Sequence, residues 1–403
     1  MISDFFILAV RNVQKRKLRS WLTMVGIFIS IATIFVLVSV SLGLEAAVNE
    51  QFRLLGTDKF FIQPRGQAAG PGSGGTIKIL QADIDVIEKV NGIKAVSYSS
   101  FGNGEVIYNK QKRFFAIIGY PLDKAEVFDE ISAYKSSEGR LLKEGDERAV
   151  MIGSLYKEGD LFTKPVHAGD KLEINGILFT VKGILQPIGN PGDDRLIYMS
   201  DKDFKQAFPD KTGIDQIIIQ VNPDVSLSDV ADRTERRLRS FREVTEKTQD
   251  FSVLKPEELL ESFGTILNII TSFLLGVAAI SLLVGGIGIA NTMYTSVLER
   301  TKEIGTMKAV GAKNKDILFI FLIESGLIGL LGGIIGVLLG IGISKLIEYI
   351  AVNQLQTTLL KAALPWYLMV GCLLFAFLAG TISGVLPAWR ATKIKPVDAL
   401  RYE

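Results

Sequence analysis

The sequence predicts an α-helical membrane protein with four transmembrane helices and an α+β extracytoplasmic domain on a helical stalk. Two observations carry this prediction: four long apolar runs almost free of charge, and a hydrophilic segment of more than two hundred residues between the first run and the second. Residues 45–262 hold 29 basic and 35 acidic side chains, a net charge of −6, whereas the rest of the chain has a net charge of +8. The two parts therefore face different surroundings.

Each apolar run is long enough to cross a bilayer as a helix. A hydrocarbon core of about 30 Å takes about 20 apolar residues, and a charge at its centre costs about 2.5 to 3.5 kcal/mol. We expect the first transmembrane helix over residues 21–44 and the others over about 263–294, 317–344 and 364–389. The third run contains one charge, Glu324, which we expect to hydrogen-bond inside the helix bundle near the inner surface; a role as a functional switch is the alternative.

Basic residues beside the apolar runs predict the orientation of the chain, because short flanks rich in Lys and Arg stay on the cytoplasmic side. Such residues precede the first run, join the second to the third and follow the fourth, whereas the loop over residues 345–361 holds only Lys345 and Lys361. We therefore expect a multi-pass protein of the plasma (inner) membrane, with both termini and the tail 390–403 in the cytoplasm and residues 45–262 outside. The first run is too long for a signal peptide and is expected to remain as an uncleaved anchor.

Residues 1–20 are expected to form a cytoplasmic amphipathic helix. Their apolar residues recur at the spacing of one helix face, with charged and amide side chains between them. Such a helix lies in the inner membrane interface or packs on another part of the protein, and the sequence leaves both open. The apolar positions are Ile2, Phe5, Phe6, Ala9, Val10 and Val13.

The segment between the first two runs is predicted to mix helices and strands. The helical pattern of the first run continues through SLGLEAAVNEQFRLLG, and Pro256 followed by two glutamates opens the helix of the second run, so these two helices should form a stalk. Residues 66–75 are a flexible loop by composition. Short helices are predicted after Gln81, after the cap Ser200 and over residues 227–241. Strands are predicted over residues 94–98, 113–119, 171–174, 178–185, 195–199 and 214–221.

The sequence gives no sign of catalytic, metal or nucleotide chemistry. The single cysteine, Cys372, excludes a disulfide framework and is expected to be a small apolar filler in the fourth run. His167 has no nucleophile motif near it and is expected in a turn before a strand. Asp193 and Asp194 follow a Pro-Gly pair, which predicts a solvated turn. GGIGIAN lies inside an apolar run and no GxxxxGK motif with a following Ser or Thr is present, so we expect a non-catalytic chain without its own cofactor, metal or nucleic-acid site.

Small residues recur at intervals of four in the apolar runs, a spacing that lets helix backbones approach closely. In the third run this spacing joins Gly329 to Gly333, Gly332 to Gly336 and Gly336 to Gly340. These glycines are the predicted packing residues of the bundle, together with Glu324. The other runs contribute Ala376, Gly380 and Gly384 in the fourth, and Gly285, Gly286 and Gly288 in the second.

A short charged loop, TSVLERTKEIGTMKAVGAKNKDI, joins the second run to the third. Its pattern predicts an amphipathic helix over residues 297–312, in which Met307, Ala309 and Val310 supply the apolar residues and Gly311 ends the helix. Such a helix is suited to docking in a groove on a partner protein, and a simple surface connection is the alternative.

This loop resembles the coupling-helix motif of FtsX-like ABC transporter permeases, ER-x-x-EIG-x-x-KA-x-GA. Two further blocks are similar to the family: AVRNVQKRKLRSWLTMVGI before the first run and PAWRATKIKPVDALRYE at the C-terminus. The outer segments GRLLKEGDERAVMIG and HAGDKLEINGILFTVKGIL resemble the MacB-like periplasmic core domain. The resemblance is to permease subunits of the MacB, LolC and LolE type VII superfamily. The loop residues that match the motif, and that the resemblance assigns to ATPase coupling, are Glu299, Arg300, Glu303, Ile304, Gly305, Lys308, Ala309 and Gly311, with Ala312 after them.

The resemblance implies a domain organisation and a function. Residues 45–262 would be the MacB-like core domain with its stalk, and residues 263–403 the FtsX-like permease domain. A permease homodimer in membrane lipid would work with two copies of a separate ABC ATPase, which bind ATP and Mg, and with a MacA-like adaptor where the cell has an outer membrane.

By the same resemblance, closure of the ATPase would move the loop helix and change the spacing of the outer domains. This is mechanotransmission, used for efflux of an amphiphilic drug, peptide or lipid-linked substrate. The alternative is an FtsX-like regulator that transmits the ATPase motion to an extracellular enzyme or signalling partner.

Overall fold

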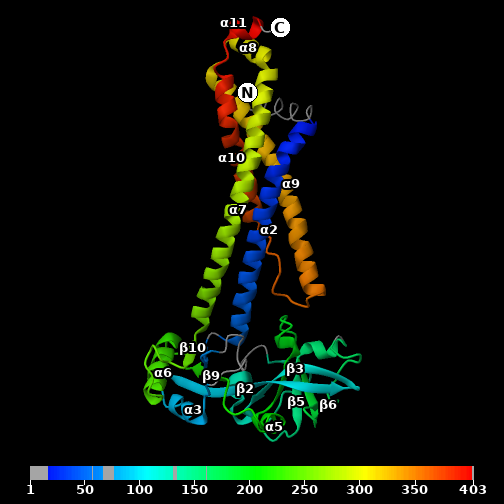
Figure 1. The fold of residues 1–403 in the computed structure, drawn as a ribbon, viewed down its shortest axis with the longest axis vertical. Helices are drawn as coiled ribbons and strands as arrows, with labels where there is room; N and C mark the ends of the chain where they lie inside the picture. Colours follow the sequence, from blue (N-terminus) through cyan, green and yellow to red (C-terminus); the bar gives the residue numbers. More distant parts are fainter. Residues whose placement is uncertain (1–16, 57, 67–76, 130–133, 160, 402–403) are drawn as a thin grey trace. The chain divides into compact units, whose positions relative to one another are not determined.

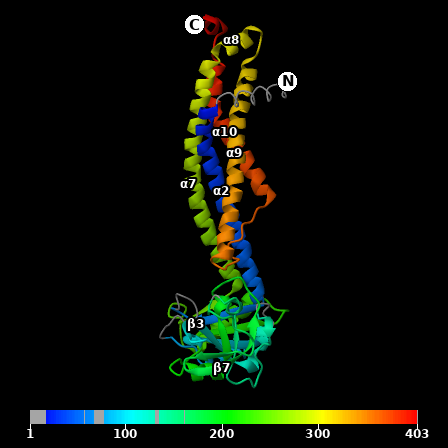
Figure 2. The same cartoon turned by 90° about the vertical axis from the view of Figure 1, so that its right-hand side faces the viewer.

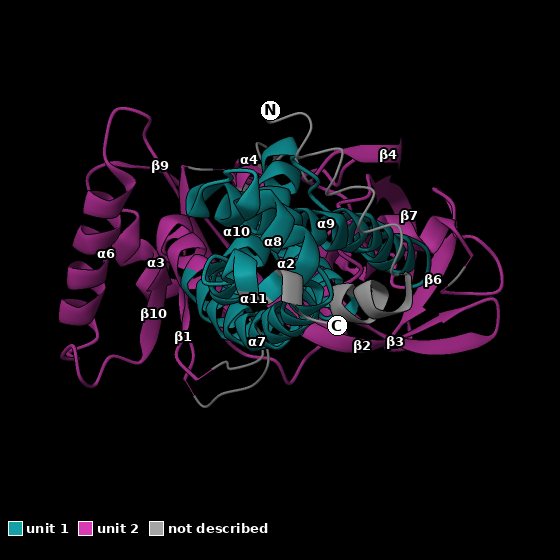
Figure 3. Ribbon diagram, turned by 90° about the horizontal axis from the view of Figure 1, so that it is seen from above, with its two compact units in different colours: residues 1–45, 265–354, 360–403 teal, residues 46–264, 355–359 magenta. Residues whose placement is uncertain are grey.

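The computed structural model describes residues 17–56, 58–66, 77–129, 134–159 and 161–401 (Figure 1). Most of the amphipathic helix predicted over residues 1–20 lies outside the described residues, as does nearly all of the loop predicted over residues 66–75. The chain divides into two compact units (Figure 3). The helical unit comprises residues 1–45, 265–354 and 360–403, and the α/β unit comprises residues 46–264 and 355–359.

The helical unit contains four helices that are long and apolar enough to cross a membrane, as the four uncharged runs predict. Figure 2 shows them as long helices, with the short α8 and α11 near one end of the unit. The predicted start of a helix at Pro256 and the predicted extension of the first helix beyond residue 44 are both confirmed. The helices are α2 (Lys17–Leu55), α7 (Pro256–Glu299), α8 (Thr301–Ala309), α9 (Asn314–Asn353), α10 (Trp366–Ala391) and α11 (Pro396–Arg401).

The α/β unit is built around a ten-stranded sheet in which the long strand β2 (Ile93–Tyr108) belongs to two lobes. The first lobe has the antiparallel order β10-β1-β9-β2, with β1 (Lys59–Pro64), β9 (Gln216–Val221) and β10 (Phe251–Leu254). Successive side chains of a strand point to opposite faces. One face of this lobe packs against α3 (Gln81–Ile87) and α6 (Leu227–Phe241), and its buried residues include Phe60, Ile62, Ile217 and Ile219.

The second lobe closes on itself, because β6 pairs with both β2 and β7. The order β2-β3-β8-β5-β7-β6 thus returns to β2 around a buried apolar core. Figure 3 shows α3 and α6 at one end of the α/β unit and β6 and β7 at the other. The remaining elements are β3 (Gln111–Tyr120), α4 (Glu126–Asp129), β4 (Ser136–Gly139), β5 (Ala149–Ile152), β6 (Lys171–Ile174), β7 (Ile177–Leu185), β8 (Ile197–Ser200) and α5 (Asp201–Ala207), with 3-10 turns at Leu122–Lys124, Ser154–Lys157 and Asp193–Arg195.

The predicted class, four apolar helices with a mixed helix and strand domain, is confirmed. Strands β1, β4, β5, β10 and the second half of β2 are not among the strands predicted from the sequence. The second half of β2 contains Gly102 and Gly104, and the sequence does not predict it as a strand because glycine is depleted in strands. Glycine is required at both positions because an added Cβ would lie 2.9 to 3.0 Å from the ring of Phe208.

Candidate functional site

The loop between α7 and α9 folds into the short helix α8. Helix α7 ends at Glu299, and Arg300 leaves helical geometry at φ −102° and ψ 17° before α8 begins. The predicted end at Gly311 is confirmed: Gly311 has φ +106°, its N–H donates to the carbonyl of Lys308, and the N–H of Ala312 donates to that of Met307. The helix predicted over residues 297–312 is therefore shorter, because residues 297–299 continue α7 and residues 310–312 form the cap.

A buried ion pair attaches the start of α8 to α9. Arg300 donates from Nη1 to Oε2 of Glu324 at 3.0 Å, and the two side chains are only 10% and 7% exposed. Arg300 also donates from Nε to Glu303 at 2.8 Å, and its guanidinium lies 5.5 Å from the centre of the Phe321 ring. The hydrogen bond predicted for Glu324 within the bundle is therefore present. Breaking a buried pair by removing one partner costs about 3 to 5 kcal/mol, so this contact holds α8 firmly.

The other end of α8 is attached to the C-terminal segment. The Nζ of Lys308 donates to the carbonyls of Thr392 at 2.6 Å and Ile394 at 2.9 Å, just after α10 ends. A cation at this position suits the negative end of the helix dipole. Gly305 faces α11, where an added Cβ would lie 2.5 Å from the Cβ of Ala399. Helix α9, helix α11 and the segment between α10 and α11 therefore hold α8 in place.

The residues that match the family motif fall into two groups. Arg300, Ile304 and Gly305 are buried, and Lys308 is bound to the C-terminal segment, so these four hold α8 on its own chain. The opposite face of the helix is open to solvent. It presents Lys302, Glu303, Thr306, Ala309 and Val310, with Val310 86% exposed, and Glu299 and Gly311 are exposed beside it. We call Lys302, Glu303, Thr306, Ala309 and Val310 the α8 outer face.

The glycines predicted to pack the bundle lie at helix contacts. An added Cβ would lie 3.0 Å from the Cα of Gly380 at Gly329, and 2.6 Å from the Cβ of Ala376 at Gly333. Glycine at these positions lets α9 and α10 approach backbone to backbone. Gly384 faces the side chain of Ser325 in the same interface, and Gly332 is buried in α9.

Glycines also set the contacts of α2. Gly336 and Gly340 of α9 face α2, where an added Cβ would lie 2.7 Å from the carbonyl of Phe28 and 2.8 Å from the Phe35 ring. Gly26 of α2 faces the backbone of Gly285 in α7, at 2.8 Å. Cys372 is buried in the apolar core of this unit, as expected of a small apolar filler.

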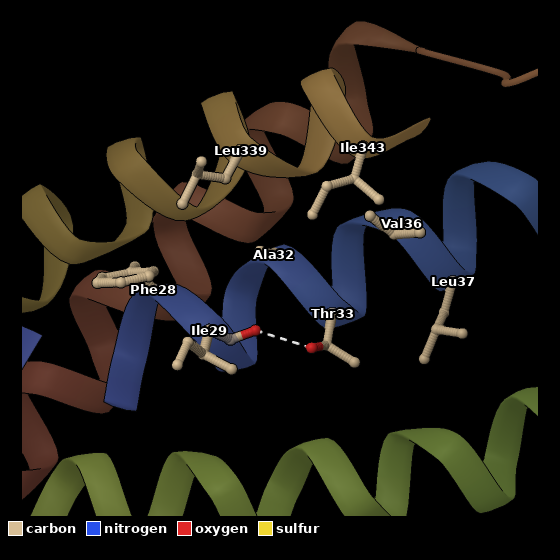
Figure 4. A pocket seen from close by; sticks show the side chains of 8 residues that line it. All are labelled: Phe28, Ile29, Ala32, Thr33, Val36, Leu37, Leu339 and Ile343. Atoms are coloured by element: carbon tan, nitrogen blue, oxygen red, sulfur yellow. Dashed lines mark hydrogen bonds between the residues drawn. The ribbon is translucent and has the colours of Figure 1, made fainter. Parts of the chain in front are cut away.

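Two apolar grooves lie on the described part of the helical unit, and the polar side chains that line them are bonded within their own helices. A groove of about 370 Å³ between α2 and α9 is lined by residues such as Phe28, Leu339 and Ile343 (Figure 4). Among the described residues that line this groove, Thr33 has the one polar side chain, and its hydroxyl donates to the carbonyl of Ile29 within its own helix. The second groove, of about 550 Å³ between α7 and α10, has Ser383 bonded in the same way. Both grooves suit hydrocarbon chains and do not form a polar pathway.

The segment that connects α9 to α10 is held by hydrogen bonds at two places, one in the α/β unit and one in the helical unit. In the α/β unit, the N–H of Thr358 donates to the carbonyl of Gly189 at 2.8 Å, and the hydroxyl of Thr357 donates to the same carbonyl at 3.2 Å. In the helical unit, the hydroxyl of Ser39 donates to the carbonyl of Ala363 at 2.7 Å. We call residues 355–363 the strap. No sequence signal predicts it, since both partners are far away along the chain.

The turn that contains Asp193 and Asp194 differs from the solvated turn predicted from the sequence. Asp194 is buried, and its carboxylate accepts the backbone N–H groups of Ile188 at 2.8 Å and Gly189 at 2.9 Å. The turn is thus held by an inward carboxylate and is not a solvated one. Asp193 is half-buried, and burial raises the pKa of its carboxyl. His167 lies in a turn before β6, as expected, with its side chain near Glu138.

Comparison with known proteins agrees with this architecture. Residues 20–237 match the model of the MacB-like periplasmic core domain, and residues 275–396 match that of the FtsX-like permease C-terminal domain. An uncharacterized ABC transporter permease of Methanocaldococcus jannaschii, MJ1507, is 36% identical over 100% of this chain and 98% of its own length. YknZ of Bacillus subtilis, also an uncharacterized ABC transporter permease, is 30% identical over 98% of each chain.

A longer relative matches nearly all of this chain, and a solved structure aligns with about half of it. The macrolide export ATP-binding/permease protein MacB of Bdellovibrio bacteriovorus is 31% identical over 98% of this chain, which spans 61% of that protein. The crystal structure of the periplasmic region of MacB from Actinobacillus actinomycetemcomitans aligns with a TM-score of 0.43 and 18% identity, over 54% of this chain and 97% of that one.

The resemblance drawn from the coupling motif and its flanking blocks is confirmed by these matches. Both families named from the motifs have a matching model on this chain, and MJ1507 and YknZ, both ABC transporter permeases, match it over nearly their whole length. The chain belongs to the ABC transporter permeases that join a MacB-like periplasmic core domain to an FtsX-like permease domain.

Proposed function

We propose that this chain is a permease subunit that converts ATP hydrolysis by a separate ATPase into a conformational change of its periplasmic domain. A permease of this family has an ATPase partner. In our proposal that partner docks on the α8 outer face in the cytoplasm, and two copies of it bind ATP and Mg beneath a permease homodimer. The observation that carries the proposal is that α8 is held rigidly on one side and exposed on the other.

The anchored side of α8 supports a role in force transmission. A displacement applied to a loosely attached loop would be absorbed locally. Here the pair between Arg300 and Glu324 ties α8 to α9, and Lys308 and Gly305 tie it to the segment after α10. Rigid-body shifts of packed helices are a common way of carrying a local change to a distant site.

The α8 outer face has the chemistry of a small docking surface. It combines one exposed apolar side chain, Val310, with the small Ala309 and the opposite charges of Lys302 and Glu303. An apolar anchor in a groove with charged residues around it is a recurring mode of helix recognition. Of the α8 outer face, Glu303 and Ala309 match the family motif, whereas Lys302, Thr306 and Val310 fall at its variable positions. In our proposal, residues at these variable positions recognise a particular ATPase.

Two further observations favour mechanotransmission over passage through a pore. The boundary between the two units falls inside α2 and α7, so each helix is continuous across it. The grooves found among the described residues of the helical unit are apolar. The full-length MacB relatives are named for macrolide export, and we propose efflux of an amphiphilic drug, peptide or lipid-linked substrate.

The test uses the full chain purified with its ATPase. Val310→Glu should release the ATPase, because a charge would enter the apolar anchor position. Leu80→Glu, at another exposed apolar residue in the α/β unit, is the matched control and should leave the complex intact. Co-purification and ATP-dependent efflux from cells are the measurements. A Val310→Glu chain that binds its ATPase and exports substrate like the wild type would overturn the proposal.

A further inference from the structure

A small cavity of about 220 Å³ lies inside the α/β unit. Its floor is the sheet face opposite α3 and α6, where Phe61, Ile218 and Ile118 alternate with the residues that face those helices or the barrel core. Ser99 of β2 and Gln216 of β9 lie directly opposite each other in this floor. The cavity is therefore built from the strands where the two lobes meet.

Aromatic rings and one carboxylate dominate the lining. The rings form a contiguous group: Phe128 and Tyr134 meet edge to face at 5.4 Å, and Tyr134 and Tyr198 do so at 5.1 Å. Asp193 brings its carboxylate to the same cavity, with Oδ2 accepting from Asn190 at 2.7 Å. The lining aromatic residues are Phe61, Phe101, Phe128, Tyr134 and Tyr198.

The cavity also holds polar groups with unused hydrogen-bonding capacity. Ser99 is 2% exposed, and neither its hydroxyl nor the amide of Gln216 has a side-chain hydrogen bond to any described residue. Ser99 lines the cavity, so its hydroxyl is available to hydrogen-bond a bound molecule.

The size of the cavity separates it from the transported substrate. Pockets for drug-sized molecules have about 300 to 1,000 Å³, so this one admits only a smaller ligand. The charge of the ligand follows from Asp193, because a carboxylate among aromatic rings is best stabilised by a cation. The same rings attract a cation through their π faces and cover an apolar group.

We propose that this cavity binds a small organic amine that carries one aromatic or branched apolar group. Its ammonium pairs with Asp193, its apolar group lies against the rings of Phe128 and Tyr198, and Ser99 completes its hydrogen bonds. The site is independent of the ATPase and of the exported substrate, so it stands or falls apart from the function proposed above.

The test is isothermal titration calorimetry on the full chain in detergent, with 2-phenylethylamine as the probe and 2-phenylethanol as its neutral counterpart. The amine should bind at least tenfold more tightly than the alcohol, a difference of about 1.4 kcal/mol. Asp193→Asn should remove that preference and leave the weak affinity for the alcohol unchanged. Asp210→Asn, at an exposed position of the same unit, should behave like the wild type.

A second variant guards against loss of folding in the first. Ser99→Leu fills the cavity without touching its charge, so it should abolish binding of both probes while thermal unfolding of the chain stays cooperative. Equal affinity for the two probes, no detectable binding of the amine, or an Asp193→Asn chain that keeps its preference for the amine would each overturn the proposal.

Discussion

Arg300 and Glu324 form a buried ion pair, with 3.0 Å between Nη1 of Arg300 and Oε2 of Glu324. The pair joins the residue just before α8 to the first half of α9. An acidic residue in an apolar run needs a partner, and here the partner comes from the residue at which the chain leaves α7. The pair turns a costly charge into an attachment point for the segment that we propose receives the ATPase motion.

The first prediction concerns this pair. Glu324→Leu leaves the Arg300 guanidinium buried without its main partner, and we expect a loss of about 3 kcal/mol in the free energy of unfolding. Arg300→Met in the same chain should restore part of that loss, since it removes the stranded charge. Thermal unfolding in detergent of both single variants and the double variant measures this coupling. Simple additivity of the two single effects would show that the residues do not act as a pair.

Substitutions at Lys308 and Lys302 should have different effects, because Lys308 anchors α8 and Lys302 lies on the α8 outer face. Lys308→Met removes the donor to the Thr392 and Ile394 carbonyls but leaves the α8 outer face intact. We expect this variant to bind the ATPase normally and to lose most of its ATP-dependent efflux. Lys302→Met changes the exposed face and should instead weaken ATPase binding severalfold. Identical behaviour of the two variants in co-purification and efflux would contradict the division of α8 into an anchored and a docking side.

Gly329 and Gly342 lie in the same helix, α9, and allow a packed glycine to be compared with an unpacked one. An added Cβ at Gly329 would press on the backbone of α10, whereas nothing lies within 4 Å of one at Gly342. Gly329→Ala should therefore lower the free energy of unfolding by about 1 to 3 kcal/mol through overpacking. Gly342→Ala should raise it by up to about 1 kcal/mol, because alanine favours helix. Denaturation in detergent tests both, and the idea fails if the two substitutions shift stability in the same direction.

The fourth prediction is a pH dependence in the α/β unit. Asp146 accepts two hydrogen bonds from Arg140, at 2.6 and 2.7 Å, and these lower the pKa of Asp146 to about 2. A depressed folded-state pKa means that the stabilisation is complete above the unfolded value of about 3.9 and is lost as the pH falls through about 2. Because Arg140 is 42% exposed, we expect only about 1 kcal/mol.

The matched variant for this prediction is Asp146→Asn, compared with Asp210→Asn at an exposed site. The stability difference between the wild type and Asp146→Asn should be constant from pH 7 to pH 5 and should shrink between about pH 4 and pH 2. Thermal unfolding of the full chain across this range is the measurement. A difference that grows as the pH falls would show that the sign is wrong.

Long apolar runs almost free of charge predict the four long helices of this protein well, because membrane crossing imposes a length and a composition that few other structures satisfy. The same holds for Pro256 and Gly311, whose positions follow from backbone geometry alone. Short strands such as β5 and β10 are set by pairing with distant strands, and four residues carry too little pattern to predict them.

At the candidate site, the sequence does not predict which distant residues come into contact. The sequence indicates that Glu324 needs a partner, but the choice of Arg300 depends on how α7, α8 and α9 fold back on one another. The contact between Gly305 and Ala399 joins segments nearly a hundred residues apart, and small residues alone do not predict their partners. The solvated turn predicted at Asp194 is wrong because the Pro-Gly pair before it indicates only a turn, whereas the Asp194 side chain points inward to the N–H groups of Ile188 and Gly189.

The strap gives the α/β unit more than two covalent attachments to the helical unit. The chain passes between the units four times, within α2, within α7 and on either side of residues 355–359. Thr358 is held at Gly189 inside the α/β unit, and Ala363 is held at Ser39 inside the helical unit. The residues between these two anchors are therefore a connection in addition to α2 and α7, through which strain in one unit can be passed along the chain to the other.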